Sequence, residues 1–181
     1  MADDSMAIDE LVARYRGYLL VLAQAQVEPD LHARLDLEGV VQQTLLEAWQ
    51  SSPDRAGWAT WLRRLLAHNL ADELRKLRAE KRDIDRERSL EANLTATSQR
   101  LGEMLAARHS TPSARLTREE KALQVAAALE SLPKAQREAL ILQHWHGWTL
   151  AQIAGHLHRT PAAVAGLLKR GLRQLREILD K

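Results

Sequence analysis

Four cations lie close together near the C-terminus, at the spacing of one side of a helix. They are Lys169, Arg170, Arg173 and Arg176. Cations in this arrangement can bind the phosphates of a nucleic acid while the beginning of their helix enters a major groove. The alternative is an ordinary helical hairpin whose basic side is solvated. The spacing favours DNA binding and leaves the hairpin open.

The elements that must position these cations have the form of a helix-turn-helix. Thr149-x-x-Gln152 matches a capping box and predicts a short helix to about His156. Thr160 then serves as N-cap and Pro161 as the first helical residue of a longer helix, to about Leu179. Apolar residues recur at the positions that such a pair of helices buries. These are Leu150, Ile153, Ala154, Val164, Leu167, Leu168 and Leu172.

A second candidate lies in a long helix expected over 58–82. Trp58 and Trp61 stand at its start, beside a loop, and basic side chains follow. Stacking on the indoles with phosphate contacts would bind single-stranded nucleic acid. The competing interpretation places both tryptophans in the core, because they share the apolar stripe of the helix. Asn69 falls in the same stripe, so it is either a structural polar group with partners or a base reader.

The sequence gives little support for metal binding or for catalysis. The pairs His144-x-His146 and His156-x-His158 put neighbouring histidines on different helix faces, so we expect no metal site. The absence of cysteine excludes disulfides, thiol nucleophiles and cysteine-ligated metals. No glycine-rich phosphate loop or known catalytic motif is present. We therefore expect a protein that is not an enzyme and that needs no cofactor.

Composition and charge fit a helical protein with two different surfaces. The 181 residues include no Phe and only two Tyr, which favours helices over strands. The net charge of +2 divides into −7 over residues 1–54 and +9 over residues 55–181. The longest stretch without charged side chains, 139–158, contains four His, so we expect no membrane insertion. No signal peptide is recognisable at the N-terminus, and we expect a cytoplasmic protein.

Periodicity predicts an all-α chain of two small domains joined by a flexible linker. Residues 1–7 are expected to be disordered. The first domain, 8–82, would be a three- or four-helix bundle, and the second, 117–181, would contain the helix-turn-helix. Residues 83–116 are rich in polar side chains and are expected to form the linker. The expected helices are 8–26, 37–50, 58–82, 118–131, 134–145, 149–156 and 161–179, with Asp36 and Thr117 as further caps.

Together, the two halves resemble a bacterial RNA polymerase sigma factor of the extracytoplasmic-function (ECF) class, which keeps regions two and four. Residues 40–49, VVQQTLLEAW, resemble the helix that docks on the polymerase. Residues 61–72, WLRRLLAHNLAD, resemble the helix that opens and reads the minus-ten element. Residues 129–140, 147–154 and 164–177 resemble region four, which reads the minus-thirty-five element. The usual acidic pair of the docking helix is replaced by Gly39 and Gln43, and the loop 50–57 is a few residues short.

The resemblance implies partners and site residues. The partners would be core RNA polymerase, promoter DNA and, as in many relatives, an anti-sigma protein. Polymerase contacts would fall on Glu38, Gln42, Gln43 and Glu47. Minus-ten contacts would fall on Trp58, Arg63, Arg64, His68, Asn69 and Arg75. Minus-thirty-five contacts would fall on Thr160, Ala162, Ala163, Gly166, Lys169, Arg170 and Arg173, with Lys169 and Arg170 on phosphates.

Two other functions stay open on sequence alone. A conventional transcription regulator would use the same helix-turn-helix without replacing the sigma subunit, while its N-terminal bundle senses a signal or dimerises. A helical interaction protein would not bind DNA at all. Binding to core polymerase separates the first alternative from a sigma factor, and substitution of Arg170 and Arg173 by Glu separates the second.

Overall fold

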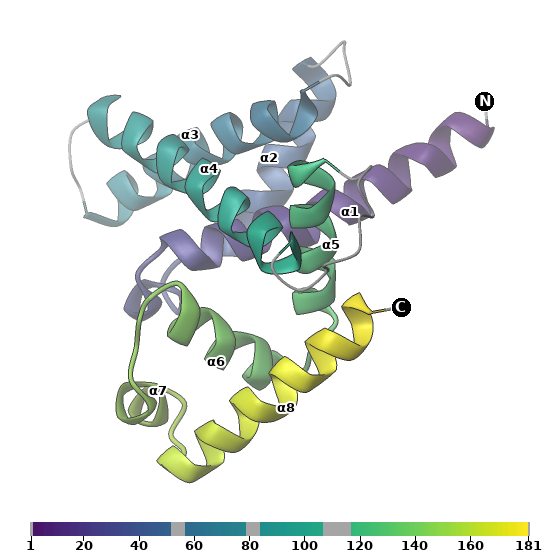
Figure 1. Ribbon diagram of the computed structural model, residues 1–181. Coiled ribbons are helices and arrows are strands. Elements are labelled where there is room, and N and C mark those ends of the chain that lie inside the picture. The colour runs from purple at the N-terminus through teal and green to yellow at the C-terminus, as the bar shows by residue number, and fades with distance from the viewer. Residues whose placement is uncertain (1, 52–56, 79–83, 107–116, 181) are drawn as a thin grey trace.

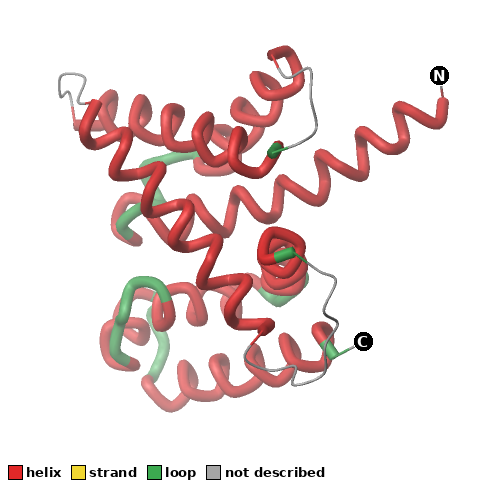
Figure 2. Tube along the Cα trace, turned by 45° about the horizontal axis from the view of Figure 1, so that its top comes forward, coloured by secondary structure: helices red, strands yellow, loops and turns green. Residues whose placement is uncertain are grey.

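The computed structural model describes residues 2–51, 57–78, 84–106 and 117–180, and every regular element in these ranges is a helix (Figure 1). The tube in Figure 2 shows the same helices connected by short loops. The expected all-α class is confirmed. In chain order the elements are α1 (Ala2–Gln26), the 3-10 helix η1 (Pro29–Leu31), α2 (Leu37–Ser51), α3 (Trp58–Arg78), α4 (Ile84–Ala106), α5 (Arg118–Glu130), α6 (Lys134–His144), α7 (Leu150–His156) and α8 (Pro161–Leu179).

Side-chain caps fix where several helices begin, as their sequence signals predict. The Asp36 carboxylate accepts a hydrogen bond from the Gly39 amide at 2.9 Å, at the start of α2. Thr117 with Glu120, and Thr149 with Gln152, form complete capping boxes that open α5 and α7. The Thr160 hydroxyl accepts from the Ala163 amide at 3.2 Å and opens α8. Each cap satisfies an amide that the helix itself leaves without a partner.

The N-terminal bundle is built by α1, α2 and α3, whose apolar stripes meet in a common core. Tyr18, Leu19 and Leu22 of α1 are fully buried, as are Leu62 and Leu66 of α3. Residues 2–7, expected to be disordered, continue α1 instead, and its first turns project from the rest of the molecule (Figure 1). The loop residues 52–56 and the expected helix end at 79–82 lie outside the described residues.

The expectation of an irregular linker is wrong over residues 84–106, which form α4. Leu94 and Leu101 of α4 are fully buried, and Thr97 and Ser98 are almost as inaccessible. Their hydroxyls have partners on α1: Gln26 Nε2 donates to Thr97 Oγ1, and the Tyr18 hydroxyl donates to Ser98 Oγ, both at 2.8 Å. Buried hydroxyls with such partners are stable in a helix interface. Residues 107–116 lie outside the described ranges.

The two expected domains share one continuous core. Helix α5 packs against α4 and α1, so the first helix of the C-terminal part completes the N-terminal bundle. Close approach of α4 and α5 depends on Gly102, where a Cβ atom would lie 2.7 Å from the Arg118 carbonyl oxygen. Two polar contacts add to this packing. His146 Nε2 lies 3.0 Å from the Gln24 carbonyl oxygen, and Arg100 donates to the His144 carbonyl at 2.8 Å.

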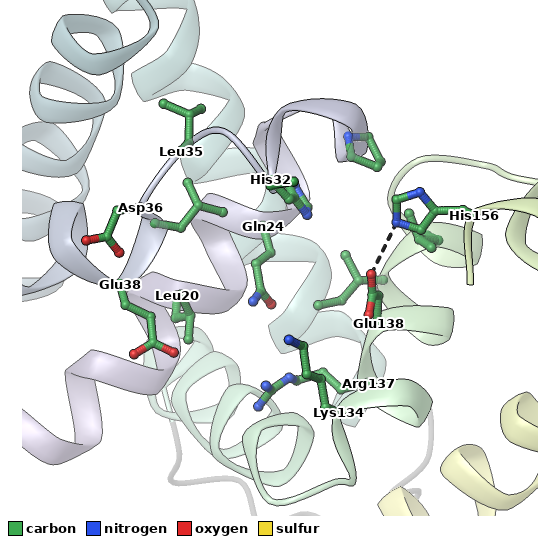
Figure 3. Close-up of a pocket in the computed structure, with 15 residues that line it drawn as sticks. Leu20, Gln24, His32, Leu35, Asp36, Glu38, Lys134, Arg137, Glu138 and His156 are labelled. Carbon is green, nitrogen blue, oxygen red and sulfur yellow. Dashed lines mark hydrogen bonds and ion pairs between the residues drawn. The ribbon is translucent and has the colours of Figure 1, made fainter. Parts of the chain in front are cut away.

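A cleft of about 390 Å³ remains between the two parts (Figure 3). The α1 residues Leu20 and Gln24 and the η1 neighbour His32 line one side. Glu138 of α6 and His156 of α7 line the other, and His156 Nε2 lies 3.2 Å from Glu138 Oε1. Separately, no helix in the described part of the chain has the length and hydropathy needed to cross a membrane.

Candidate nucleic-acid interface

Helices α7 and α8 form the helix-turn-helix that the sequence predicts. Ile153 of α7 and Val164 of α8 are completely buried, and Leu168 is nearly so. His158 occupies the turn between them with φ of 51°, a left-handed conformation that few side chains adopt without cost. The Arg159 amide closes the turn by donating to the Ala154 carbonyl oxygen at 2.9 Å. These contacts fix the direction in which α8 leaves the turn.

The opposite side of α8 is exposed and basic. Ala162, Lys169, Arg170 and Arg173 are exposed, while Ala163 and Gly166 are partly covered. The Thr160 hydroxyl oxygen accepts the capping hydrogen bond from the Ala163 amide, so it already has a partner. Arg173 lies 3.7 Å from Glu177, and both side chains are largely exposed, so that pair is weak. All seven sequence-predicted residues therefore lie on α8 or at its cap, with the cations along one exposed side.

Helix α3 presents few of its six predicted DNA-contacting residues to solvent. Trp58 is 6% exposed and packs against Tyr15 with ring centroids 5.9 Å apart, so it belongs to the core. Asn69 donates to Thr44 Oγ1 at 3.0 Å and to Glu47 Oε2 at 3.1 Å. These two bonds make Asn69 a structural tie between α3 and α2, one of the two alternatives that the sequence left open.

Arg63 is the most deeply placed of the six, at 8% exposure. Its Nη1 donates to the Tyr18 hydroxyl at 2.9 Å, and its Nη2 donates to Thr60 Oγ1 at 3.0 Å. The Tyr18 hydroxyl in turn donates to Ser98, so one chain of hydrogen bonds joins α3, α1 and α4. Burial raises the pKa of Tyr18, although the Arg63 charge opposes this, so the phenol stays a donor.

Two further candidates on α3 are engaged in ion pairs. His68 lies 3.1 Å from Glu87 of α4 and 3.7 Å from Asp72, and Arg75 pairs with Asp72 at 2.8 Å. Arg64 differs from them, because it is exposed and makes no hydrogen bond or ion pair with any described residue. In this conformation Arg64 is the member of the set best placed to meet a phosphate.

Helix α2 carries the residues predicted to contact polymerase. Glu38 is exposed and pairs with Arg16 at 3.1 Å. Gln42 and Gln43 are exposed, and Gln43 donates to Glu47 at 2.7 Å. Glu47 also accepts from Asn69 and is partly covered.

Sequence reasoning missed the apolar part of this surface. Trp49 is 51% exposed, and Leu46 is 50% exposed. The missed signal is the helical spacing of Gln42, Leu46 and Trp49, which lie side by side, away from the buried Val40, Thr44 and Ala48. We call Gln42, Leu46 and Trp49 the α2 patch.

The histidine pairs serve protein contacts. His146 and His156 have the partners described above, and His158 is in the turn before α8. Among the described residues, no three potential ligands come together in a way that could hold a metal ion.

Comparison with known proteins identifies the C-terminal part. Residues 122–175 match the family model described as "Sigma-70, region 4". A search of curated proteins gives no match. Among solved structures, the chain is similar to the sigma factor RpoE from Bartonella quintana, in its co-crystal structure with the anti-sigma factor NepR. That similarity has 18% identity and a TM-score of 0.35, and covers 99% of this chain and 98% of the other.

Because the TM-score is low, only the region 4 match is used below. The matched residues run from α5 to near the end of α8 and include α7 and most of α8. Residues 122–175 of this chain therefore resemble region 4 of the sigma-70 proteins, and the helix-turn-helix of α7 and α8 lies within the matched residues.

Proposed function

We propose that this chain is a sigma factor of the ECF type, which binds core RNA polymerase and directs it to promoters. The observation that carries the proposal is the exposed basic side of α8, within a helix-turn-helix that matches sigma-70 region 4. This match supports a role in promoter recognition and does not favour the regulator or the interaction protein. Catalysis would belong to the polymerase, and the protein would work in the cytoplasm.

The α2 patch supports the polymerase contact. A half-exposed tryptophan and leucine beside amide side chains have the composition of a protein interface. Glu38 and Glu47 lie on the same helix as the patch, and Glu47, Asp72 and Glu73 line a groove between α2 and α3. Negative charge there disfavours DNA and suits a protein partner. We propose that α2 docks on the polymerase through this surface.

We propose that α3 recognises the minus-ten element and that Arg64 is its first contact with the DNA. Arg63, His68, Asn69 and Arg75 could reach DNA only after giving up the partners that they have in this conformation. Promoter opening would therefore have to be coupled to a rearrangement of α3 against α2 and α4. The anti-sigma partner expected from the resemblance remains a prediction.

Run-off transcription tests the proposal. Purified core polymerase is assayed on a promoter library with and without the protein, and new start sites with shared upstream elements are expected. The variant Leu46→Ala with Trp49→Ala should lose binding to core polymerase while keeping its circular dichroism spectrum. The matched control is Leu150→Ala in α7, because Leu150, expected from the sequence to be buried, is 37% exposed. A folded protein that neither binds core nor directs transcription would refute the sigma function.

A further inference from the structure

Helix α6 is attached to the rest of the fold at its two ends. At its start, residues 131–133 connect it to α5, which packs within the N-terminal bundle. At its end, the turn after α6 meets the end of α1, where His146 Nε2 donates to the Gln24 carbonyl oxygen at 3.0 Å (Figure 1). Along their lengths α1 and α6 approach each other over only a small area. We call α6, α7 and α8 the α6–α8 unit, which the turn with His146 closes against α1.

Two imidazoles meet at this closing contact. The ring of His32, just after η1, packs edge to face on the ring of His146, with centroids 6.3 Å apart. His32 Nε2 donates to the Val27 carbonyl oxygen at 2.9 Å. Both neutral rings therefore carry their proton on Nε2, and acid adds a second proton at Nδ1. If both rings took up that proton, two positive charges would face each other in a partly buried contact, where water screens them poorly.

The surroundings of His32 disfavour its protonation in the closed arrangement. Burial lowers the pKa of His32 below the ordinary value of 6.5, and the charges of His146 and His156 act in the same direction. The Val27 carbonyl and Glu138 oppose this effect without outweighing it. Exposure to water away from His146 would let His32 bind a proton more tightly. The closed arrangement is therefore fully favoured above pH 6.5 and becomes less favoured as the pH falls toward the lower pKa of closed His32.

The carboxylates that line the cleft beside the two rings already have partners. Glu138 Oε1 lies 3.2 Å from His156 Nε2, within the α6–α8 unit (Figure 3). Asp36 caps α2, and Glu38 pairs with Arg16. The other charged groups near the contact are cations, and extra positive charge there opposes a further proton. They are Lys134 and Arg137 of α6 and, on the α4 side, Arg100, which donates to the His144 carbonyl oxygen.

We propose that His32 and His146 form a pH-sensitive latch, which holds the α6–α8 unit against the N-terminal bundle at neutral pH and releases it in acid. The unit would rotate about residues 131–133, where Arg137 Nη1 donates to the Glu130 carbonyl oxygen at 3.1 Å. Two buried polar atoms beside the latch, Gln24 Oε1 and Trp145 Nε1, have no partner among the described residues. The closed contact is therefore less stable than a fully paired one.

Release would affect promoter binding, and this consequence rests on the proposed sigma function. The minus-ten and minus-thirty-five elements lie about 25 base pairs apart, or roughly 85 Å along B-DNA. A compact chain of 181 residues has a radius of gyration of about 16 Å and is thus roughly 40 Å across. Helices α3 and α8 cannot reach both elements while the α6–α8 unit is closed. Acid would favour the opening that promoter binding requires.

The test uses the full chain without polymerase or DNA. The sequence contains no cysteine, so Ala92→Cys on α4 and Ala151→Cys on α7 provide two exposed sites for a fluorescent donor and acceptor. Energy transfer and far-ultraviolet circular dichroism are recorded from about pH 8 to about pH 5.5, which brackets the ordinary histidine pKa. The labelled chain is compared with His32→Gln and His146→Gln, because glutamine keeps an N–H donor and takes up no proton. His158→Asn is the matched control, since His158 is exposed and asparagine tolerates its left-handed φ.

We expect energy transfer in the otherwise unchanged chain to decrease with acidification while the circular dichroism spectrum stays constant. The ratio of open to closed molecules should rise by up to about tenfold per pH unit, the limit for uptake of one proton. His158→Asn should show the same rise, His146→Gln a smaller one and His32→Gln none. Constant energy transfer in the unchanged chain, a full rise in His32→Gln, or loss of helix signal along with energy transfer would overturn the latch. Failure to bind core polymerase would instead overturn the sigma function and leave the latch in place.

Discussion

Replacing Tyr18 by Phe tests whether Arg63 is a structural residue in the folded chain. The Tyr18 hydroxyl accepts from Arg63 Nη1 at 2.9 Å and donates to Ser98 Oγ at 2.8 Å. Tyr18 is 0% exposed and Arg63 is 8% exposed, so water has little access to replace either bond. Arg63 Nε already lacks a partner among the described residues. The substitution leaves a second buried N–H of a charged group without an acceptor.

The expected loss follows from these contacts. A buried donor deprived of its acceptor destabilises a protein by about 1–3 kcal/mol, with more expected when the donor is charged. We therefore expect Tyr18→Phe to lower the free energy of unfolding by about 2–3 kcal/mol. Urea unfolding followed by circular dichroism measures it, because a change of this size moves the midpoint by about 1 M or more in a protein of this size.

Tyr15→Phe is the matched control. Tyr15 lies one turn earlier in α1, is 8% exposed, and its hydroxyl makes no hydrogen bond with a described residue. Removing that hydroxyl should change the free energy of unfolding by less than about 0.5 kcal/mol. If the two variants were equally stable, the hydrogen-bonded chain through Tyr18 would not hold Arg63. The argument against Arg63 as a ready DNA contact would then fail.

Three further predictions concern helix contacts, the turn before α8 and the region around η1. Gly102→Ala places a methyl group 2.7 Å from the Arg118 carbonyl oxygen and should destabilise the fold by about 1–3 kcal/mol in thermal unfolding. Gly155→Ala is its control, because a Cβ atom there has no described atom within 4 Å, and it should stabilise α7 by up to about 1 kcal/mol. His158→Gly relieves the left-handed φ of 51° and should stabilise the protein by about 1 kcal/mol in urea; a loss would show that the imidazole has a role of its own. Burial lowers the pKa of His32 below 6.5, so the imidazole binds a proton more tightly in the unfolded state than in the folded state. The contribution of His32 to the free energy of unfolding should therefore be complete above pH 6.5 and should decrease as the pH falls toward the folded-state pKa. His32→Gln should show less of this loss between pH 7 and 5, and an unchanged pH profile would refute the assignment.

The sequence was most informative where local chemistry decides the structure. Capping at Asp36, Thr117, Thr149 and Thr160 was predicted from residue types and spacing, and each cap has the expected amide partner. A cap involves residues three positions apart, so its signal is complete within one turn. The helix-turn-helix follows from two such caps and the apolar spacing between them.

The sequence misled where partners come from distant segments. In residues 84–106, Leu90, Leu94 and Leu101 recur at helical spacing, but Thr97 and Ser98 on their own argue against a buried helix. Their burial depends on Gln26 and Tyr18, about 70 to 80 positions earlier in the chain. Trp49 shows a different limit, because it lies within an apolar pattern and yet faces outward, and only its spacing with Gln42 and Leu46 indicates this.

The candidate DNA contacts on α3 and α8 differ for the same reason. On α8, a cation on the exposed side has only solvent and helix neighbours, so spacing alone places Lys169 and Arg170 correctly. On α3, both sides of the helix are covered, by α2 and by α4, and basic or polar residues there acquire partners. Asn69 meets Glu47 on one side, and His68 meets Glu87 on the other. A polar residue on a helix packed between two others is therefore a structural candidate first. It becomes a DNA contact only if binding of a partner separates those helices.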